Sequence, residues 1–150
     1  DYRNGYINVD IIEGKGDVTA DIANLPDDFF EEGSVREFVV RDVLDHITYV
    51  QGKRFLRQCY RWLQENGTIE IHTPNLRNLA RMIATQDNHE AVVWLYSTDG
   101  QGSTYYPSNF SKWGYTETAL TEELENIGFI IIKMHDDCLG YGLLCLAVKR

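Results

Sequence analysis

The strongest constraint on the fold is an alternation of strand-like and helix-like segments in the middle of the chain. Residues 36–41 (Arg-Glu-Phe-Val-Val-Arg) and 68–73 (Thr-Ile-Glu-Ile-His-Thr) are short β-branched runs typical of strands. Between them, residues 52–65 carry apolar side chains at helical spacing. These side chains are Phe55, Leu56, Cys59 and Leu63. A strand–helix–strand order predicts neighbouring parallel strands, and therefore an α/β fold with a mostly parallel sheet.

The segments on either side of this unit continue the pattern. Residues 6–12 form a β-branched run that predicts a strand, and residues 17–20 form a shorter extended stretch. Asn66-Gly67 is expected to close the central helix as a left-handed cap. Asn75 can cap a further helix, whose buried stripe is expected at four positions. These positions are Leu76, Leu79, Ala80 and Ile83.

The C-terminal part predicts one more helix and a hairpin. Residues 97–115 show no periodicity, and a loop of this length in a compact domain is usually functional or mobile. Thr116 then caps a helix that Gly128 ends. The last two strands, residues 129–134 and 143–149, are joined by a turn short enough for an antiparallel pair.

Polar residues follow three of the predicted strands. Asp10, Asp21 and the pair Arg41-Asp42 lie at or near strand ends, which share one edge of a parallel sheet. A carboxylate there can accept both hydroxyls of a ribose, and Asp21 with the apolar Ile22 suits an adenine. Each Asp taken alone has a simpler interpretation as a turn or cap residue.

A series of short motifs runs along nearly the whole chain in a fixed order. They are Gly5-Tyr-Ile-Asn-Val-Asp10, Ala20-Asp21-Ile22, Leu25-Pro26, Gly33-Ser-Val-Arg-Glu-Phe38, Val43-Leu-Asp-His46, Tyr60-Arg-Trp-Leu63, Asn66-Gly67-Thr-Ile-Glu-Ile71, Pro74-Asn75-Leu76, Leu120-Thr-Glu-Glu-Leu124 and Gly128-Phe129. In this order and spacing they resemble a class I S-adenosylmethionine-dependent methyltransferase of the short predicted type. The resemblance implies a Rossmann-like sheet that ends in an antiparallel hairpin, with S-adenosyl-L-methionine as the cofactor.

The same resemblance assigns roles to residues of the acidic edge. It implies that Asp10 holds the ribose hydroxyls, that Asp21 contacts the adenine amino group and that Ile22 packs on the ring. Arg41 and Asp42 would line the methionine side of the cofactor. Asp45-His46 matches a Leu-Glu-His signature of the family, with Asp in place of Glu.

One departure from the family concerns the start of the chain. The Gly-rich loop that follows the first strand of the family would lie just before Asp1, and Gly14-Lys-Gly16 cannot replace it because it follows the second strand of the pattern. We therefore expect residues 1–150 to be one methyltransferase-like domain, a fragment that lacks its first strand. The gap would expose two strand edges. We expect another chain, or residues that are not in this sequence, to fill it.

Further residues are candidates for acceptor chemistry. Transfer of a methyl group needs a base only when the acceptor is protonated, and His46 or Asp42 could serve. His46 could instead order the turn after its strand. The loop at 97–115 could form a lid over the substrate, or could simply pack against the domain. Its candidate substrate-binding residues are Tyr105, Tyr106, Asn109 and Trp113.

Composition narrows the partners. The net charge of −9 argues against binding to nucleic acid. No apolar run is long enough to span a bilayer, and Cys59 and Cys145 lie in apolar patterns typical of reduced, buried thiols. We therefore expect a cytoplasmic protein with no membrane partner. His72 is expected to be structural, and no histidine or cysteine spacing predicts a metal site.

Three functions remain as hypotheses. The first is a methyltransferase acting on a small molecule or a glycan precursor. The second is a degenerate, non-catalytic module of the same fold, serving as a scaffold or interaction domain in a homo-oligomer or a larger multidomain chain. The third, a nicotinamide-dependent oxidoreductase, rests only on the Tyr49–Lys53 spacing, and Gly52 would weaken a helix that carries both residues.

Overall fold

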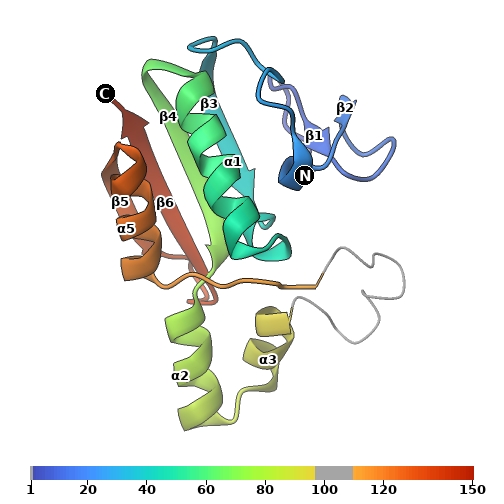
Figure 1. Ribbon diagram of the computed structural model, residues 1–150. Helices are drawn as coiled ribbons and strands as arrows, with labels where there is room; N and C mark the ends of the chain where they lie inside the picture. The colour runs from blue at the N-terminus through green and yellow to red at the C-terminus, as the bar shows by residue number, and fades with distance from the viewer. Residues whose placement is uncertain (1, 97–109) are drawn as a thin grey trace.

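The computed structural model describes residues 2–96 and 110–150, which form an α/β fold with two separate sheets. Figure 1 shows a small sheet of two strands beside a larger sheet of four. The strands of the larger sheet are, in spatial order, β3 (Val35–Arg41), β4 (Leu63–Pro74), β6 (Gly142–Lys149) and β5 (Phe129–Asp136). The predicted α/β class is confirmed, and no ladder among the described residues joins the smaller sheet to the larger one.

The central unit is the strand–helix–strand motif that the sequence predicts. Strand β3 (Val35–Arg41) and strand β4 (Leu63–Pro74) are parallel, with Phe38 opposite Ile69 and Arg41 opposite His72. Helix α1 (Tyr49–Trp62) connects them. The two strands therefore end at the same edge of the sheet, where ligands bind in folds of this kind.

Helix α1 begins three residues earlier than predicted and ends three residues earlier. Thr48 caps its start, because its side chain accepts from the Gln51 N–H while the Gln51 side chain accepts from the Thr48 N–H. The helix ends where Leu63, which is fully buried, turns to extended backbone. The predicted cap at Asn66-Gly67 is therefore wrong: Asn66 does have a positive φ of 62°, but it lies inside β4.

Two short helices follow β4. Asn75 caps α2 (Leu76–Gln86) as predicted, because its side chain accepts from two backbone N–H groups of the first turn. Leu79 is fully buried, but Ala80 is exposed, so the predicted stripe is wrong at that position. Helix α3 (His89–Tyr96) was not predicted from the sequence. It packs on α2 and completes a second apolar cluster with Leu79.

The C-terminal segment confirms the predicted helix and hairpin. Thr116 caps α5 (Glu117–Ile127), and Gly128 ends the helix with a φ of 120°. Strands β5 (Phe129–Asp136) and β6 (Gly142–Lys149) pair antiparallel, and β6 also pairs antiparallel with β4. Helices α1 and α5 cover the same face of the larger sheet (Figure 1).

The smaller sheet is shorter than the sequence predicts. Strand β1 is limited to Val9–Asp10, and β2 to Val18–Thr19. The Asn8 side chain donates to backbone oxygens of Arg3 and Tyr6. Local hydrogen bonds of this kind compete with a ladder. The predicted strand over residues 6–12 is therefore wrong except at its centre.

The segment that follows the smaller sheet is attached to the rest of the fold through α1, and the Tyr6 hydroxyl, before β1, donates to Glu37 of β3. The first 3-10 turn, η1 (Ile22–Asn24), lies against this helix together with the residues that follow it. Gln58 and Arg54 both donate to the Leu25 carbonyl, at 3.1 and 3.2 Å. The Trp62 indole N–H donates to the Asp27 carbonyl at 3.0 Å. These bonds fix the end of the β1–β2 unit to the helix that connects β3 and β4.

Cys59 and Cys145 are buried free thiols, as predicted, and Cys138 is exposed. Burial raises the pKa of the Cys145 thiol to about 12. Of the helices in the described part of the chain, none is long and apolar enough to cross a membrane.

The buried face of α1 gives the first testable prediction. Leu56 is fully buried between the helix and the sheet, so Leu56→Ala should lower the free energy of unfolding by about 2–5 kcal/mol. Val50 lies on the same helix with 74% of its surface exposed, and Val50→Ala should change stability by less than about 0.5 kcal/mol. Urea denaturation followed by circular dichroism measures both. Equal losses for the two variants would contradict this packing of α1.

Candidate functional site

The carboxyl edge of β3 and β4 is the centre of the candidate site. Asp42 follows β3 directly, and a second 3-10 turn, η2 (Leu44–His46), comes next. The Asp42 N–H donates to the carbonyl of His72 on β4 at 3.0 Å. Asp42 has a φ of 48°, a left-handed conformation that few residues other than glycine adopt. The chain therefore turns sharply at this point, which keeps the Asp42 side chain at the strand end.

Asp42 pairs with a histidine that the sequence did not assign to the site. His72 Nδ1 lies 2.6 Å from Asp42 Oδ1, and His72 Nε2 lies 3.7 Å from Asp137 Oδ2. The hydrogen bond to Asp42 raises the pKa of His72 above its ordinary value of 6.5, and Asp137 adds to this, while burial opposes it. One sequence signal was available: both residues come at the ends of adjacent parallel strands.

The remaining edge residues of β3 and η2 face other partners. Arg41 donates to Glu70 at 2.7 Å, across the sheet face that no helix of the described residues covers. His46 Nδ1 lies 3.7 Å from Asp45 Oδ2 at the end of η2. His46 therefore stands after a strand end, as the sequence predicts, but its contact there is with Asp45 rather than Asp42.

Asp10 and Asp21 come together at the end of the smaller sheet. The Asp10 carbonyl accepts from the Ala20 N–H at 2.9 Å, which brings the ends of β1 and β2 side by side. Asp10 Oδ1 accepts from the Ile12 N–H, and Asp21 Oδ1 accepts from the Ala23 N–H. Both residues thus serve as turn and cap residues, the simpler of their two interpretations. Ile22 is partly buried against the core.

These two groups of edge residues remain on separate sheets. Asp10, Asp21 and Ile22 belong to the β1–β2 unit, whereas Arg41 and Asp42 follow β3. Within residues 2–96 and 110–150, no hydrogen bond or ion pair joins one group to the other directly. The roles of all five in cofactor binding remain predictions.

A cavity of about 390 Å³ lies at the same end of the larger sheet. Its walls come from the end of β4, from α2 and α3, and from residues 111–114, and most of its lining is apolar. Its lining residues are Asp45, Pro74, Leu76, Leu79, Leu95, Tyr96, Ser111, Lys112, Trp113 and Gly114. This volume falls within the range of small-molecule sites, which are about 300–1,000 Å³.

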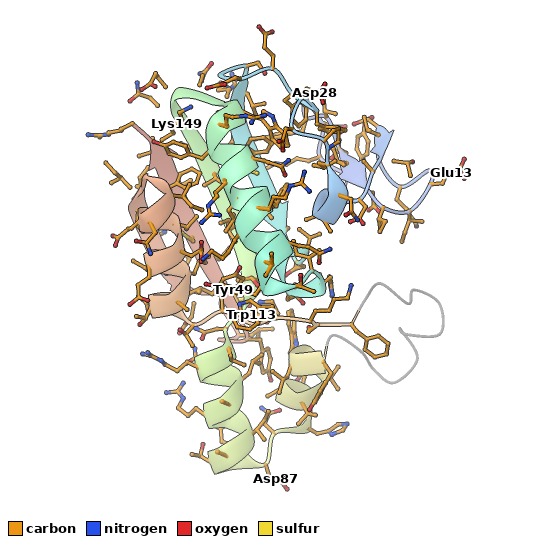
Figure 2. The ribbon with its side chains drawn as sticks, viewed as in Figure 1. Glu13, Asp28, Tyr49, Asp87, Trp113 and Lys149 are labelled. Carbon is orange, nitrogen blue, oxygen red and sulfur yellow. The ribbon has the colours of Figure 1, made fainter. Side chains whose placement is uncertain are left out.

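One predicted substrate-binding residue, Trp113, lines this cavity. Its ring packs on Tyr49 with centroids 4.6 Å apart, and Figure 2 shows the two side chains together at the start of α1. Trp113 is also fixed through its backbone, because its N–H donates to the Asp45 carbonyl. The other three predicted residues, Tyr105, Tyr106 and Asn109, lie outside the described residues.

The Tyr49–Lys53 pair exists, but it serves as a contact between helices. Both residues lie on one face of α1, with Lys53 Nζ 3.3 Å from the Tyr49 hydroxyl. The Tyr49 hydroxyl donates to Glu123 of α5, and Lys53 lies 3.5 Å from the same carboxylate. The hydrogen bond to Tyr49 and the charge of Glu123 raise the pKa of Lys53. This arrangement does not favour the oxidoreductase hypothesis, because both the Tyr49 hydroxyl and the Lys53 ammonium are already bound to Glu123.

Gly52 does not prevent this helix from forming, and its position explains why glycine stands there. Gly52 is buried, and a Cβ there would lie 3.1 Å from the Tyr115 hydroxyl. The missing side chain allows α1 to approach the segment that carries Tyr115. Burial raises the pKa of Tyr115 well above its ordinary value of 10.0, so its hydroxyl stays protonated.

Among the described residues, no group of three or more histidine, cysteine or acidic side chains is arranged to hold a metal ion.

Comparison with known proteins identifies the fold. No protein-family model and no curated protein matches the chain. Among solved structures, an S-adenosylmethionine-dependent methyltransferase of Mesorhizobium loti matches with a TM-score of 0.65 at 15% identity, over 94% of this chain and 78% of that protein. One from Archaeoglobus fulgidus matches with a TM-score of 0.64 at 16% identity, over 94% of this chain and 74% of that protein.

Other similar structures are longer. A Burkholderia thailandensis 1,6-didemethyltoxoflavin-N1-methyltransferase, solved with bound 1,6-didemethyltoxoflavin and S-adenosylhomocysteine, matches with a TM-score of 0.59 at 14% identity. The match covers 94% of this chain and 59% of that enzyme. This chain spans only 43% of a similar Bordetella parapertussis protein.

The cavity gives the second prediction. A Cβ at Gly114 would lie 3.4–3.5 Å from Leu76, so Gly114→Leu places its added carbons against the cavity wall. We expect this variant to weaken the binding of small aromatic fragments by about tenfold or more, because a filled cavity cannot accept them. Saturation-transfer NMR measures the effect.

Ala80→Leu is the matched control for that experiment. Ala80 is exposed on α2 and does not line the cavity, so a leucine side chain there should leave fragment binding unchanged. If Gly114→Leu binds the fragments as the original chain does, they do not bind in this cavity.

The chain has the α/β fold of class I S-adenosylmethionine-dependent methyltransferases.

Proposed function

We propose that this chain is the cofactor-binding part of an S-adenosylmethionine-dependent methyltransferase that acts on a small, largely apolar molecule. The observation that carries the proposal is that the mainly apolar cavity lies at the carboxyl edge of the larger, methyltransferase-like sheet, where the half-exposed carboxylate of Asp42 follows β3. Asp45 and Pro74, which follow β3 and end β4, both line the cavity. A methyl acceptor in the cavity would therefore lie beside the end of β3.

The acidic residues have the capacity that the cofactor needs. Asp10 Oδ1 accepts one backbone N–H, and a carboxylate has about four acceptor positions, so Asp10 retains acceptors for ribose hydroxyls. Asp42 keeps 52% of its side chain exposed although it pairs with His72, so it can also accept from a ligand. Asp21, with Ile22 beside it, would take the adenine.

The chemistry requires mainly positioning by the protein. S-adenosylmethionine, when bound, supplies a methyl group on a sulfonium, and the acceptor atom forms a bond to this carbon as the bond to sulfur breaks. The cavity would orient the acceptor, and alignment of this kind can supply about 7–11 kcal/mol. His46 or Asp42 would take the proton of an acceptor hydroxyl or amine.

The cavity lining also bears on the class of acceptor. Leu76, Leu79 and Leu95 form much of its wall, with Trp113 at the side. Such a surface favours an organic molecule with an apolar body over a glycan, whose hydroxyls would lose hydrogen bonds to water on entry. We therefore place a glycan precursor second.

A non-catalytic module of the same fold remains the second candidate function. One observation favours it: the carboxylates of Asp10 and Asp21 already serve a turn and a cap. A domain that only needed to fold would use them in this way without any ligand.

Cofactor binding is the third prediction. We expect the chain to bind S-adenosylhomocysteine, and we expect Asp10→Ala to weaken binding by about ten- to a hundredfold for each ribose hydrogen bond lost. Isothermal titration calorimetry measures both affinities. Asp28→Ala is the control, because Asp28 is an exposed turn residue in none of the proposed contacts. If the unaltered chain fails to bind, the non-catalytic module becomes the better explanation.

A further inference from the structure

His72 joins three segments that are distant in sequence. Its two ring nitrogens face Asp42 at the end of β3 and Asp137 in the turn between β5 and β6, at 2.6 and 3.7 Å. The His72 side chain is only 16% exposed, whereas the Asp42 side chain is 52% exposed. The imidazole is therefore the inner member of the pair, and Asp42 is the member that a ligand can reach.

The inner end of this arrangement is fixed by backbone. The Asp137 carboxylate accepts from the N–H groups of Leu139, Tyr141 and Gly142, at 3.0, 3.1 and 2.8 Å. A Cβ at Gly142 would collide with His72 Nε2 and would lie 2.6 Å from Asp137 Oδ2. The imidazole thus occupies space that exists only because residue 142 is glycine.

Asp42 is held by His72 twice. The Asp42 N–H donates to the His72 carbonyl, and the Asp42 carboxylate accepts from the His72 ring. The φ of 48° at Asp42 is an unfavourable conformation for a residue with a side chain. Such conformations persist where surrounding contacts determine them, and they cluster at functional sites.

We propose that His72 is a positioning residue of the cofactor edge, which holds the Asp42 carboxylate at the end of β3 to receive the ammonium group of the cofactor's amino acid part. This inference rests on the proposed function, because it assumes that S-adenosylmethionine binds at this edge. The ligand chemistry is specific: a primary ammonium would share a carboxylate with an imidazolium.

The pKa of His72 depends on the charged groups around it, so it should report whether an ammonium group also binds Asp42. On the same sheet face, Arg41 pairs with Glu70 at 2.7 Å, and Arg3 lies 3.9 Å from Glu70. Glu70 offsets only one of these two positive charges, but the two carboxylates that contact the imidazole, Asp42 and Asp137, are the charges that raise the pKa of His72. The hydrogen bond to Asp42 raises the pKa of the imidazole, as described above.

The fourth prediction follows from linkage. An ammonium group bound to Asp42 would partly neutralise the carboxylate that stabilises the charged imidazole. The pKa of His72 should therefore fall when S-adenosylhomocysteine binds. Affinity should then increase as the pH rises from the pKa of the complex to that of the free chain. 5′-Methylthioadenosine lacks the amino acid part and should leave the pKa of His72 unchanged. NMR titration of the imidazole measures these values, and Asp42→Asn should lower the pKa in the free chain.

Variants of His72 separate positioning from titration. His72→Leu removes the hydrogen bond to Asp42 and should weaken S-adenosylhomocysteine by about tenfold or more, with little change for 5′-methylthioadenosine. His72→Asn keeps an N–H donor but does not titrate, so it should restore most of the affinity without its pH dependence. His135→Leu, at an exposed position on β5, is the control.

The outcomes distinguish this inference from the proposed function. If the unaltered chain binds S-adenosylhomocysteine but His72→Leu binds it equally well, or if the pKa of His72 does not move on binding, His72 is only structural and the inference is wrong. If the unaltered chain does not bind at all, the proposed function fails and the positioning role fails with it. Should His72→Leu not fold, the loss of pH dependence in His72→Asn and the change in the His72 pKa when the unaltered chain binds S-adenosylhomocysteine still decide the point.

Discussion

Hydrogen bonds along both edges of β4 hold together the larger sheet, whose carboxyl edge carries Asp42, His72 and the cavity. β4 pairs in parallel with β3 on one side and antiparallel with β6 on the other. Ile69 and Ile71 point into the core beneath α1 and α5, while Glu70 and His72 lie on the opposite face. One strand therefore contributes to the core and also supplies the carboxyl edge.

The polar contacts at that edge connect segments that are far apart in the sequence, so short-range sequence patterns do not predict them. Asp42 contacts His72 across the two parallel strands, and the Asn75 side chain donates to Asp136 at the end of β5 at 2.7 Å. Because Asp137 also reaches His72, the hairpin of β5 and β6 helps to set the geometry at the end of β3. The cavity lies beside this network and shares the end of β4 with it.

Helix α1 links the two halves of the proposed cofactor edge. Its buried side packs on the larger sheet, and its Gln58 and Trp62 side chains hold the segment that follows the smaller sheet. The position of Asp10 and Asp21 relative to Asp42 thus depends on the packing of this helix rather than on a shared sheet. A substitution in the core beneath α1 would therefore be expected to shift Asp10 and Asp21 relative to Asp42.

The sequence alone determined the elements whose signals are local. The β-branched runs of β3 and β4, the apolar face of α1 and the caps at Asn75 and Thr116 were all readable, because they depend on side-chain periodicity and on hydrogen bonds within a few residues. Only the tertiary structure decided where α1 ends and how short β1 remains, because the burial of Leu63 and the side-chain bonds of Asn8 override local propensity. It also decided which residues contact His72, for which the alternating strand predicts a structural position. Its partners Asp42 and Asp137 lie 30 positions before it and 65 after it, and strand pairing across the sheet is what brings them within reach.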